Sequence, residues 1–411
     1  MILKKLGWTC FLLTFLSLSF PPSSLSGTKL DLKPKIAGSW LMETNFFRSE
    51  FVEREVWNYL IQPGIELGFE APKTKLFFDF TLDINEFDVR DDGALDPTLD
   101  PLTDDDLNFV GYTGLFGARY KALDRLLIGL DDSLYRTRDP AQIDPLNNFR
   151  GRELYTINRL TPSLFYDFER KFSLGLRYRN TITDYDSDLF SDISENRVMF
   201  DMIYNFTRRS LLDLEYQYWA TDFDRQDFDY SSNQIKLIFR QQFKAFAIEA
   251  GGGYQNRRTK GPILDDIDVF TYRVAFTAQN PPAPETRRSH ISLVAESNLN
   301  DLDIGGRYFI GTRISLDAGH VFLEKIPVGL NAFYQRSSYQ NVYGLTGEGL
   351  VERRIDDTFN ISGRVGYNLR QYLTFWVTGG HEKRDSNLFG RSFDNNYVTV
   401  GLEFGYPLSR L

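Results

Sequence analysis

The residues of this sequence best suited to acid–base chemistry are three histidines, His290, His320 and His381. His290 and Ser292 stand two positions apart, and in an extended strand that spacing places both side chains on one face, as a hydrolytic Ser-His dyad requires. No acidic residue stands at a spacing that would complete such a site. A histidine beside a serine at the end of a strand is the favoured interpretation, and we expect no catalytic residues and no enzyme.

Oxygen ligands are concentrated in one Asp-rich stretch, which includes Asp91, Asp92, Asp96, Asp100, Asp104, Asp105 and Asp106. Such a cluster could hold Ca²⁺, but the spacing is not that of an EF-hand, and Pro97 and Pro101 favour an open loop. We therefore expect a solvated acidic loop, with no metal site and no cofactor. A loop of this length could also fold inward as a constriction, and the sequence leaves that alternative open.

Charged residues of both signs recur inside segments that otherwise alternate between apolar and polar. Ten are candidates for lining a water-filled interior: Arg119, Arg177, Arg179, Arg240, Arg313, Arg364, Asp79, Asp83, Glu215 and Glu249. Two interpretations remain open, a charged path for permeating solutes and a ladder of cross-strand ion pairs that only holds a wall together. Five aromatic residues fall on the same polar face, where they could stack on sugar rings or fill space: Phe77, Phe165, Trp219, Phe333 and Trp376.

The elements that carry these charges have a period of two, the pattern of strands with one apolar face. From Trp57 to Phe69 every second residue is apolar, apart from a proline at position 63, and the pattern resumes from Leu76 to Ile84 after a turn. Segments of about 10 to 14 residues have the length of tilted transmembrane strands. Two irregularities are predicted: the segment from Leu126 loses its pattern early, and Pro63 and Pro162 should cause a bulge or a local break.

The connections between these segments alternate between short and long. Short ones are expected at 71–74, 121–125, 169–171, 207–209, 244, 323–325 and 370–372, and long polar ones at 88–107, 138–153, 184–195, 222–231, 258–267, 340–356 and 384–395. Outer-membrane barrels have short periplasmic turns and long outer loops. We predict one all-β domain, residues 27–411, forming an antiparallel up-and-down transmembrane barrel of about 18 strands, with 16 as the alternative. Aromatic residues near the short turns would form the interfacial girdle.

The N-terminus has the features of a secretory signal. Lys4 and Lys5 precede an apolar run from Leu6 to Phe20, and the small residues Ser24 and Ser26 follow. We predict cleavage after Ser26, which would remove the only cysteine, Cys10. Beyond this segment no stretch approaches the roughly 20 apolar residues of a transmembrane helix. The formal net charge of -9 disfavours nucleic acid as a partner.

Near the C-terminus, Thr399, Gly401, Phe404 and Tyr406 follow the spacing of the last-strand signal that the barrel-assembly machinery recognises. Proteins with this signal usually end at the last aromatic residue. This chain continues through Pro407 to Leu411, so the signal would be recognised slightly internally.

The segment Met42–Arg48, followed by Trp57–Phe87 with Gln62–Leu67, resembles the opening of the putative β-barrel porin 2 type of outer-membrane proteins. The resemblance implies a pore in the outer membrane of a Gram-negative cell, often associated with exopolysaccharide or exosortase gene clusters, and it carries no functional residues. The expected function is passive transport or export of a hydrophilic solute, with polysaccharide as one candidate. The alternative is a structural, adhesive or assembly barrel that acts through its outer loops. Expected partners are membrane lipid, lipopolysaccharide and the barrel-assembly machinery.

Overall fold

The computed structural model of the chain describes residues 28–51, 53–90, 107–139, 152–169, 171–187, 190–224, 229–260, 266–280, 288–301, 308–346, 349, 351–370 and 372–406. Three sequence predictions lie outside these residues: the signal segment 1–26, the acidic stretch Asp91–Asp106 and the tail Leu408–Leu411. Within the described part of the chain, no helix has both the length and the apolar character needed to cross a membrane.

Long strands make up most of the described residues, as the period-two pattern predicts. There are 18 of them: β1 Lys29–Glu43, β2 Glu55–Ala71, β3 Thr74–Arg90, β4 Phe109–Leu123, β5 Leu126–Thr137, β6 Tyr155–Asp167, β7 Phe172–Tyr185, β8 Ile193–Asn205, β9 Ser210–Phe223, β10 Tyr230–Gln242, β11 Phe246–Thr259, β12 Ile267–Asn280, β13 Ser289–Asp301, β14 Tyr308–Phe322, β15 Ile326–Leu345, β16 Val351–Arg370, β17 Leu373–Ser386 and β18 Phe393–Gly405.

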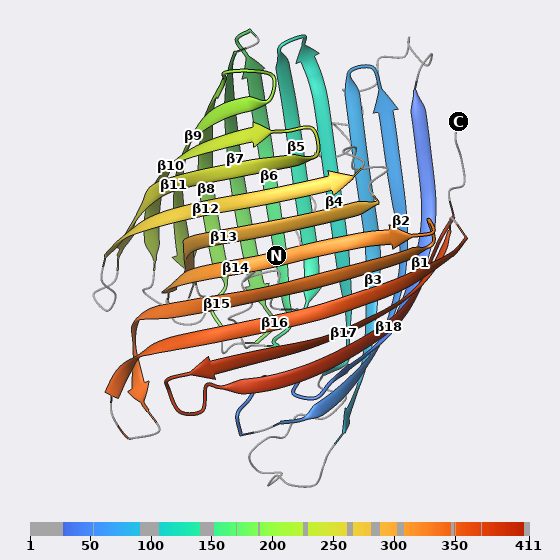
Figure 1. Cartoon of the computed structure of the whole chain (residues 1–411), viewed down its shortest axis with the longest axis vertical. Helices are drawn as coiled ribbons and strands as arrows, with labels where there is room; N and C mark the ends of the chain where they lie inside the picture. The colour runs from blue at the N-terminus through green and yellow to red at the C-terminus, as the bar shows by residue number, and fades with distance from the viewer. Residues whose placement is uncertain are drawn as a thin grey trace.

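The strands form one closed sheet. Each strand pairs antiparallel with the next along the chain. The ring is completed by β1 and β18, for example through Ser39 opposite Gly401. In Figure 1 the yellow-to-red strands of the C-terminal half cross in front of the blue-to-green strands of the N-terminal half, as opposite walls of a barrel do. Closure leaves no unpaired strand edge. The predicted fold, with 18 strands, is confirmed.

The two ends of the barrel differ. Connections such as 72–73, 124–125 and 323–325 join strands at one end, which we call the short-turn end, and connections such as 44–54 and 138–154 lie at the other, the long-loop end. The alternation predicted from the sequence is present. The connection 44–54, between β1 and β2, was not among the predicted long loops.

Alternate residues of each strand face outward, and they are mainly apolar. Leu164, Leu176, Val198, Leu237 and Val365 are among the large apolar side chains that the isolated chain leaves exposed. In water such a surface would be costly, and in a lipid bilayer it is the favoured one. Near the short-turn end the outward face carries clustered aromatic rings: the ring centroids of Tyr166 and Phe168 are 4.5 Å apart, and the same contact recurs for Tyr204 with Phe206 and for Phe243 with Phe246.

Both predicted irregularities have a structural cause. In β5 the apolar pattern ends because Asp132 occupies an outward position, where the side-chain amide of Asn158 donates a hydrogen bond of 2.8 Å to its carboxylate. Pairing between β2 and β3 is interrupted beside Pro63, and pairing between β6 and β7 beside Pro162. In both places it resumes in the same register. The prolines therefore cause local breaks, and no bulge forms there, because a missing N–H removes a hydrogen bond without inserting a residue.

Three of the four residues of the assembly signal make defined contacts at the end of the last strand. The ring of Tyr372 lies 5.6 Å from that of Phe404 and 5.7 Å from that of Tyr406, all near the short-turn end. Gly401 lies under the indole of Trp376, since a Cβ at this position would come within 2.4 Å of that ring. A packing requirement therefore accounts for Gly401, in addition to the recognition role predicted from the sequence.

We expect the double substitution Phe404→Ala and Tyr406→Ala to lower the amount of folded barrel in the outer membrane severalfold. The two rings carry the predicted recognition signal and also pack against Tyr372. Heat-modifiable migration of membrane extracts measures the folded fraction. Leu402→Ala is the matched control, because Leu402 is equally exposed on the outward face of β18 but lies outside the signal. Equal losses in both variants would show that apolar area, and not the signal, sets the yield.

Candidate permeation path inside the barrel

The inner face of the barrel carries all ten charged residues that the sequence singled out, because each stands at an inward position of its strand. Seven of the ten form an ion pair with a residue of a neighbouring strand or of the next strand but one. The predicted ladder of cross-strand ion pairs is therefore present, and the described residues supply its geometry.

One continuous group of ion pairs, which we call the charged wall, runs from β7 to β13. Arg177 contacts Asp201 at 2.8 Å and Glu215 at 3.7 Å. Arg240 contacts Asp213 at 3.1 Å and Glu249 at 2.7 Å. Arg273 then joins Glu249 at 3.1 Å to Glu296 at 2.7 Å. Three arginines and five carboxylates thus lie along this half of the interior, with the carboxylates of β8 and β9 between Arg177 and Arg240.

A second group lies next to the charged wall, nearer the long-loop end. The carboxylate of Glu195 is shared by Arg179 at 2.8 Å and Arg197 at 2.9 Å. The guanidinium of Arg197 also lies 4.1 Å from the ring centroid of Trp219. Stacking of this kind holds an arginine in place without a further carboxylate.

The remaining predicted residues are held in several ways. Arg119 forms a bidentate pair with Asp131 at 2.8 and 2.9 Å. The ammonium of Lys35 lies 2.5 Å from Asp79. Arg313 lies 3.8 Å from the ring centroid of Phe333, and Arg364 lies 4.5 Å from that of Trp376. Three of the inward aromatic residues, Trp219, Phe333 and Trp376, therefore support arginines. Their ring faces are occupied in this way, so these residues are poorly placed for the sugar stacking that the sequence left open.

The connection between β1 and β2 folds into the barrel. We call its residues 44–51 the inward segment. Asn45, Phe46 and Arg48 are almost fully buried, and Phe46 packs against Phe87 on the inner face of β3, with ring centroids 5.6 Å apart. The side chain of Asn45 closes a tight turn by hydrogen bonding with both backbone groups of Ser49. The sequence pattern missed this segment, although two adjacent phenylalanines in a connection are a signal of burial.

Arg48 anchors the inward segment to β17, which is the next strand but one from β1 around the closed sheet. Its guanidinium lies 3.0 Å from the carboxylate of Glu382 on β17, and the two side chains are 10% and 2% exposed. Burial tends to lower the pKa of Arg48, but the carboxylates of Glu382 and Glu43 outweigh this and raise its pKa above the ordinary value. The φ of Arg48 is 51°, in the left-handed region that is costly for a residue with a side chain. The buried ion pair stabilises this backbone conformation.

A second ion pair joins the end of β1, directly before the inward segment, to the connection between β5 and β6. Arg152 lies 3.3 Å from Glu43 and 4.4 Å from the ring centroid of Phe46. Burial lowers the pKa of Arg152, and the nearby charge of Arg48 acts in the same direction. Asn395 on β18 donates a further hydrogen bond to Glu43. Residues from distant parts of the chain thus narrow the interior near the long-loop end.

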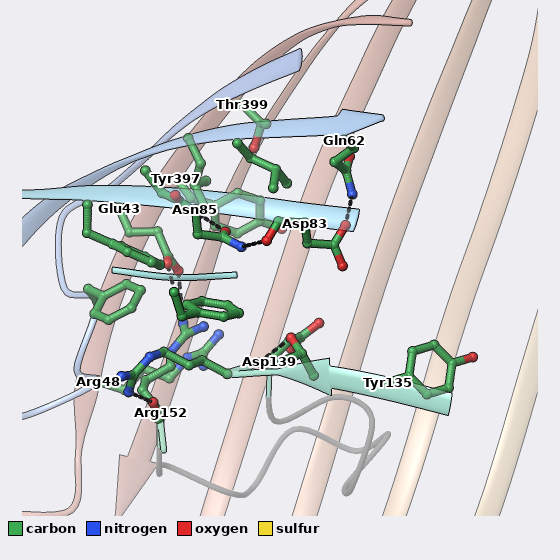
Figure 2. A pocket seen from close by; sticks show the side chains of 18 of the residues that line it. Glu43, Arg48, Gln62, Asp83, Asn85, Tyr135, Asp139, Arg152, Tyr397 and Thr399 are labelled. Atoms are coloured by element: carbon green, nitrogen blue, oxygen red, sulfur yellow. Dashed lines mark hydrogen bonds and ion pairs between the residues drawn. The ribbon is translucent and has the colours of Figure 1, made fainter. Parts of the chain in front are cut away.

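A cavity of about 660 Å³ lies directly beside the inward segment, and we call it the chamber. Its lining includes Asn58 and Gln62 of β2, Asp83 and Asn85 of β3, and Tyr135 of β5. Figure 2 shows Tyr135 on one side of the chamber and Gln62 and Asp83 on the other, with Arg48 and Arg152 at one end beside Glu43. The interior therefore has a polar space large enough for a small solute.

The three histidines make hydrogen bonds on both faces of the sheet. His290 is hydrogen-bonded to Asp317 at 2.8 Å on the inner face, and Ser289 to His320 at 2.7 Å on the outer face. Ser292 lies opposite Asp317 in the pairing of β13 with β14, so the predicted serine and histidine share the inner face with a carboxylate. No hydrogen bond joins Ser292 to His290 among the described residues, whereas a Ser-His dyad requires one. His381 contacts Asn396 at 3.0 Å. In the same part of the chain, no group of three or more His, Cys, Asp or Glu residues could hold a metal ion.

Comparison with known families agrees with this architecture. Residues 245–406 match the family described as putative beta-barrel porin 2. The match confirms the resemblance to this family. It covers β11 to the end of β18, whereas the sequence resemblance was drawn mainly from the N-terminal third. No curated protein sequence matches the chain. The chain is a closed 18-stranded β-barrel whose C-terminal part is similar to this family.

Several solved outer-membrane proteins are similar in structure. OccAB4 from Acinetobacter baumannii has 12% identity and a TM-score of 0.49, with 94% of this chain and 100% of that chain covered. A BenF-like porin from Pseudomonas fluorescens Pf-5 has 14% identity and a TM-score of 0.48, with 93% and 99% covered. OpdK from Pseudomonas aeruginosa, solved with vanillate, has 12% identity and a TM-score of 0.45, with 92% and 99% covered.

Proposed function

We propose that the barrel conducts small hydrophilic solutes passively across the outer membrane through its interior. The observation that carries this proposal is the chamber, a polar cavity of about 660 Å³ inside a closed barrel whose inner face is charged and whose outer face is apolar. Barrels of this strand number leave room for an aqueous channel. Nothing in the comparisons supports a polysaccharide as the solute, so the proposal is limited to small solutes.

The test is single-channel recording of the purified barrel in planar lipid bilayers, where we expect stepwise ion conductance. Since Cys10 is the only cysteine, a Cys10→Ser background allows one thiol to be placed at will. A charged, impermeant thiol reagent should reduce the current through Thr113→Cys, which lines the chamber. It should leave Val110→Cys unchanged, because Val110 is exposed on the outer face of the same strand. A barrel without conductance would favour a structural or adhesive role instead.

The proposal extends to how the protein reaches its membrane. Residues 1–26 are proposed as a cleaved signal for passage through the inner membrane of a Gram-negative cell, on the strength of their charged, apolar and small-residue pattern. Insertion would then depend on the barrel-assembly machinery, with lipid and lipopolysaccharide around the outer face.

A further inference from the structure

The chamber differs from the charged wall in the chemistry of its lining. On strands β2, β3, β4 and β18 the lining consists largely of amide and hydroxyl side chains, and we call this part of the lining the floor of the chamber. These side chains are Asn58 and Gln62 on β2, Asn85 on β3, Thr113 on β4 and Thr399 on β18. These groups both donate and accept hydrogen bonds, in contrast to the one-directional groups of the arginine and carboxylate pairs. Their chemistry suits a neutral solute with many hydroxyl groups.

The charges in the chamber lining largely cancel. Arg48 is paired with Glu382 and Arg152 with Glu43, all at the end formed by the inward segment. Arg138 and Asp139 also line the chamber and add one charge of each sign. The excess charge of the lining is therefore that of Asp83. Its carboxylate accepts hydrogen bonds from the neutral Gln62 at 2.7 Å and Thr113 at 3.3 Å, and no cation of the described residues lies within ion-pair distance. The floor of the chamber is therefore slightly negative and disfavours anions.

Apolar surface is interleaved with these polar groups. Leu41 and Leu60 lie beside the amides, Phe87 and Phe109 close one end, and the rings of Tyr135 and Tyr397 also line the space. Aromatic and aliphatic surface beside a few hydrogen-bonding groups is typical of small-molecule sites. A pyranose ring has the same two characters, an apolar face of C–H groups and a rim of hydroxyls.

We propose that the chamber is a binding site for a small neutral sugar, of monosaccharide or disaccharide size. Amides and Asp83 would hold its hydroxyls, and Tyr135 and Tyr397 would contact its apolar faces. The volume of about 660 Å³ falls within the range of small-ligand pockets. This inference rests on the proposed function, because it names the class of solute for the same path.

The test uses glucose and glucuronate as probes, which share a ring and differ by one carboxylate. Binding is measured by saturation-transfer NMR on the folded barrel, and as block of single-channel current where the barrel conducts. We expect glucose to bind at millimolar concentration and glucuronate at least about fivefold more weakly. Gln62→Leu with Asn85→Leu should weaken glucose binding by tenfold or more, since each lost hydrogen bond weakens it by about fivefold.

The matched control is Asn331→Leu with Ser362→Val, a cross-strand pair on the inner face of β15 and β16, outside the chamber. Glucose binding should be unchanged in this control. Tighter binding of glucuronate than of glucose, or equal loss in both double variants, would overturn the assignment. Conductance without sugar binding would overturn it and leave the transport proposal intact. Sugar binding to a barrel that does not conduct would support the chamber and refute transport.

Discussion

Arg48→Ala is expected to destabilise the folded barrel by about 3–5 kcal/mol, the usual consequence of leaving one partner of a buried ion pair behind. Glu382, whose side chain is 2% exposed, would lose the guanidinium 3.0 Å away. Replacing both partners, Arg48→Met with Glu382→Leu, should restore most of the stability, because apolar side chains of similar volume avoid the desolvation penalty. Urea unfolding followed by tryptophan fluorescence measures both variants.

The same substitution should change the pore. Without the ion pair, the inward segment is no longer held against β17, so the open-channel current of Arg48→Ala should be larger and noisier than that of the parent protein. Lys75→Ala is the control, since its pair with Glu70 is 69% and 50% exposed and should contribute nothing measurable. If the unfolding midpoint and the open-channel current of Arg48→Ala both match those of Lys75→Ala, then the Arg48–Glu382 pair does not hold the inward segment in place.

The barrel could be predicted from the sequence because its physical requirement is local. A membrane-spanning strand must present apolar residues on one face and polar residues on the other. Apolar and polar residues therefore alternate along each strand, as in Trp57–Phe69. The strand number and the short turns follow from the same pattern. The alternation of inward and outward positions along a strand also predicted that Arg177 and Glu249 face the interior, and they do so in the structure.

The inward segment could not be predicted in this way. It has no periodicity, and the partner of Arg48 stands 334 positions further along the chain. Only the closure of β1 onto β18 brings β17 close to this segment. The pairing of the inward charges was equally out of reach, because it depends on the register between strands. Asp201 lies beside Arg177 only because β7 and β8 pair with Gly175 opposite Asp201.

The double substitution Arg177→Ser with Arg240→Ser should make the pore markedly more selective for cations. Both guanidinium groups belong to the charged wall, and removing them leaves Asp201 and Asp213, with side chains 5% and 6% exposed, without their nearest cations. Excess negative charge in a narrow, low-dielectric interior acts strongly on passing ions. In a tenfold salt gradient we expect the reversal potential to move on the order of 10 mV toward the cation limit, which is about 59 mV.

A charge-neutral variant separates this effect from damage to the wall. Arg177→Ser with Asp201→Asn removes one charge of each sign from the same ion pair, so the packing changes by a similar amount while the net charge of the interior does not. Its reversal potential should therefore stay at the parent value. The arginines of the double substitution are 32% and 41% exposed, so solvent screens part of their loss. Asp201 and Asp213 are left almost buried without their nearest cations, so we expect a barrel that folds but is less stable than the parent. A conducting, folded double variant with an unchanged reversal potential would show that ions do not pass along the charged wall.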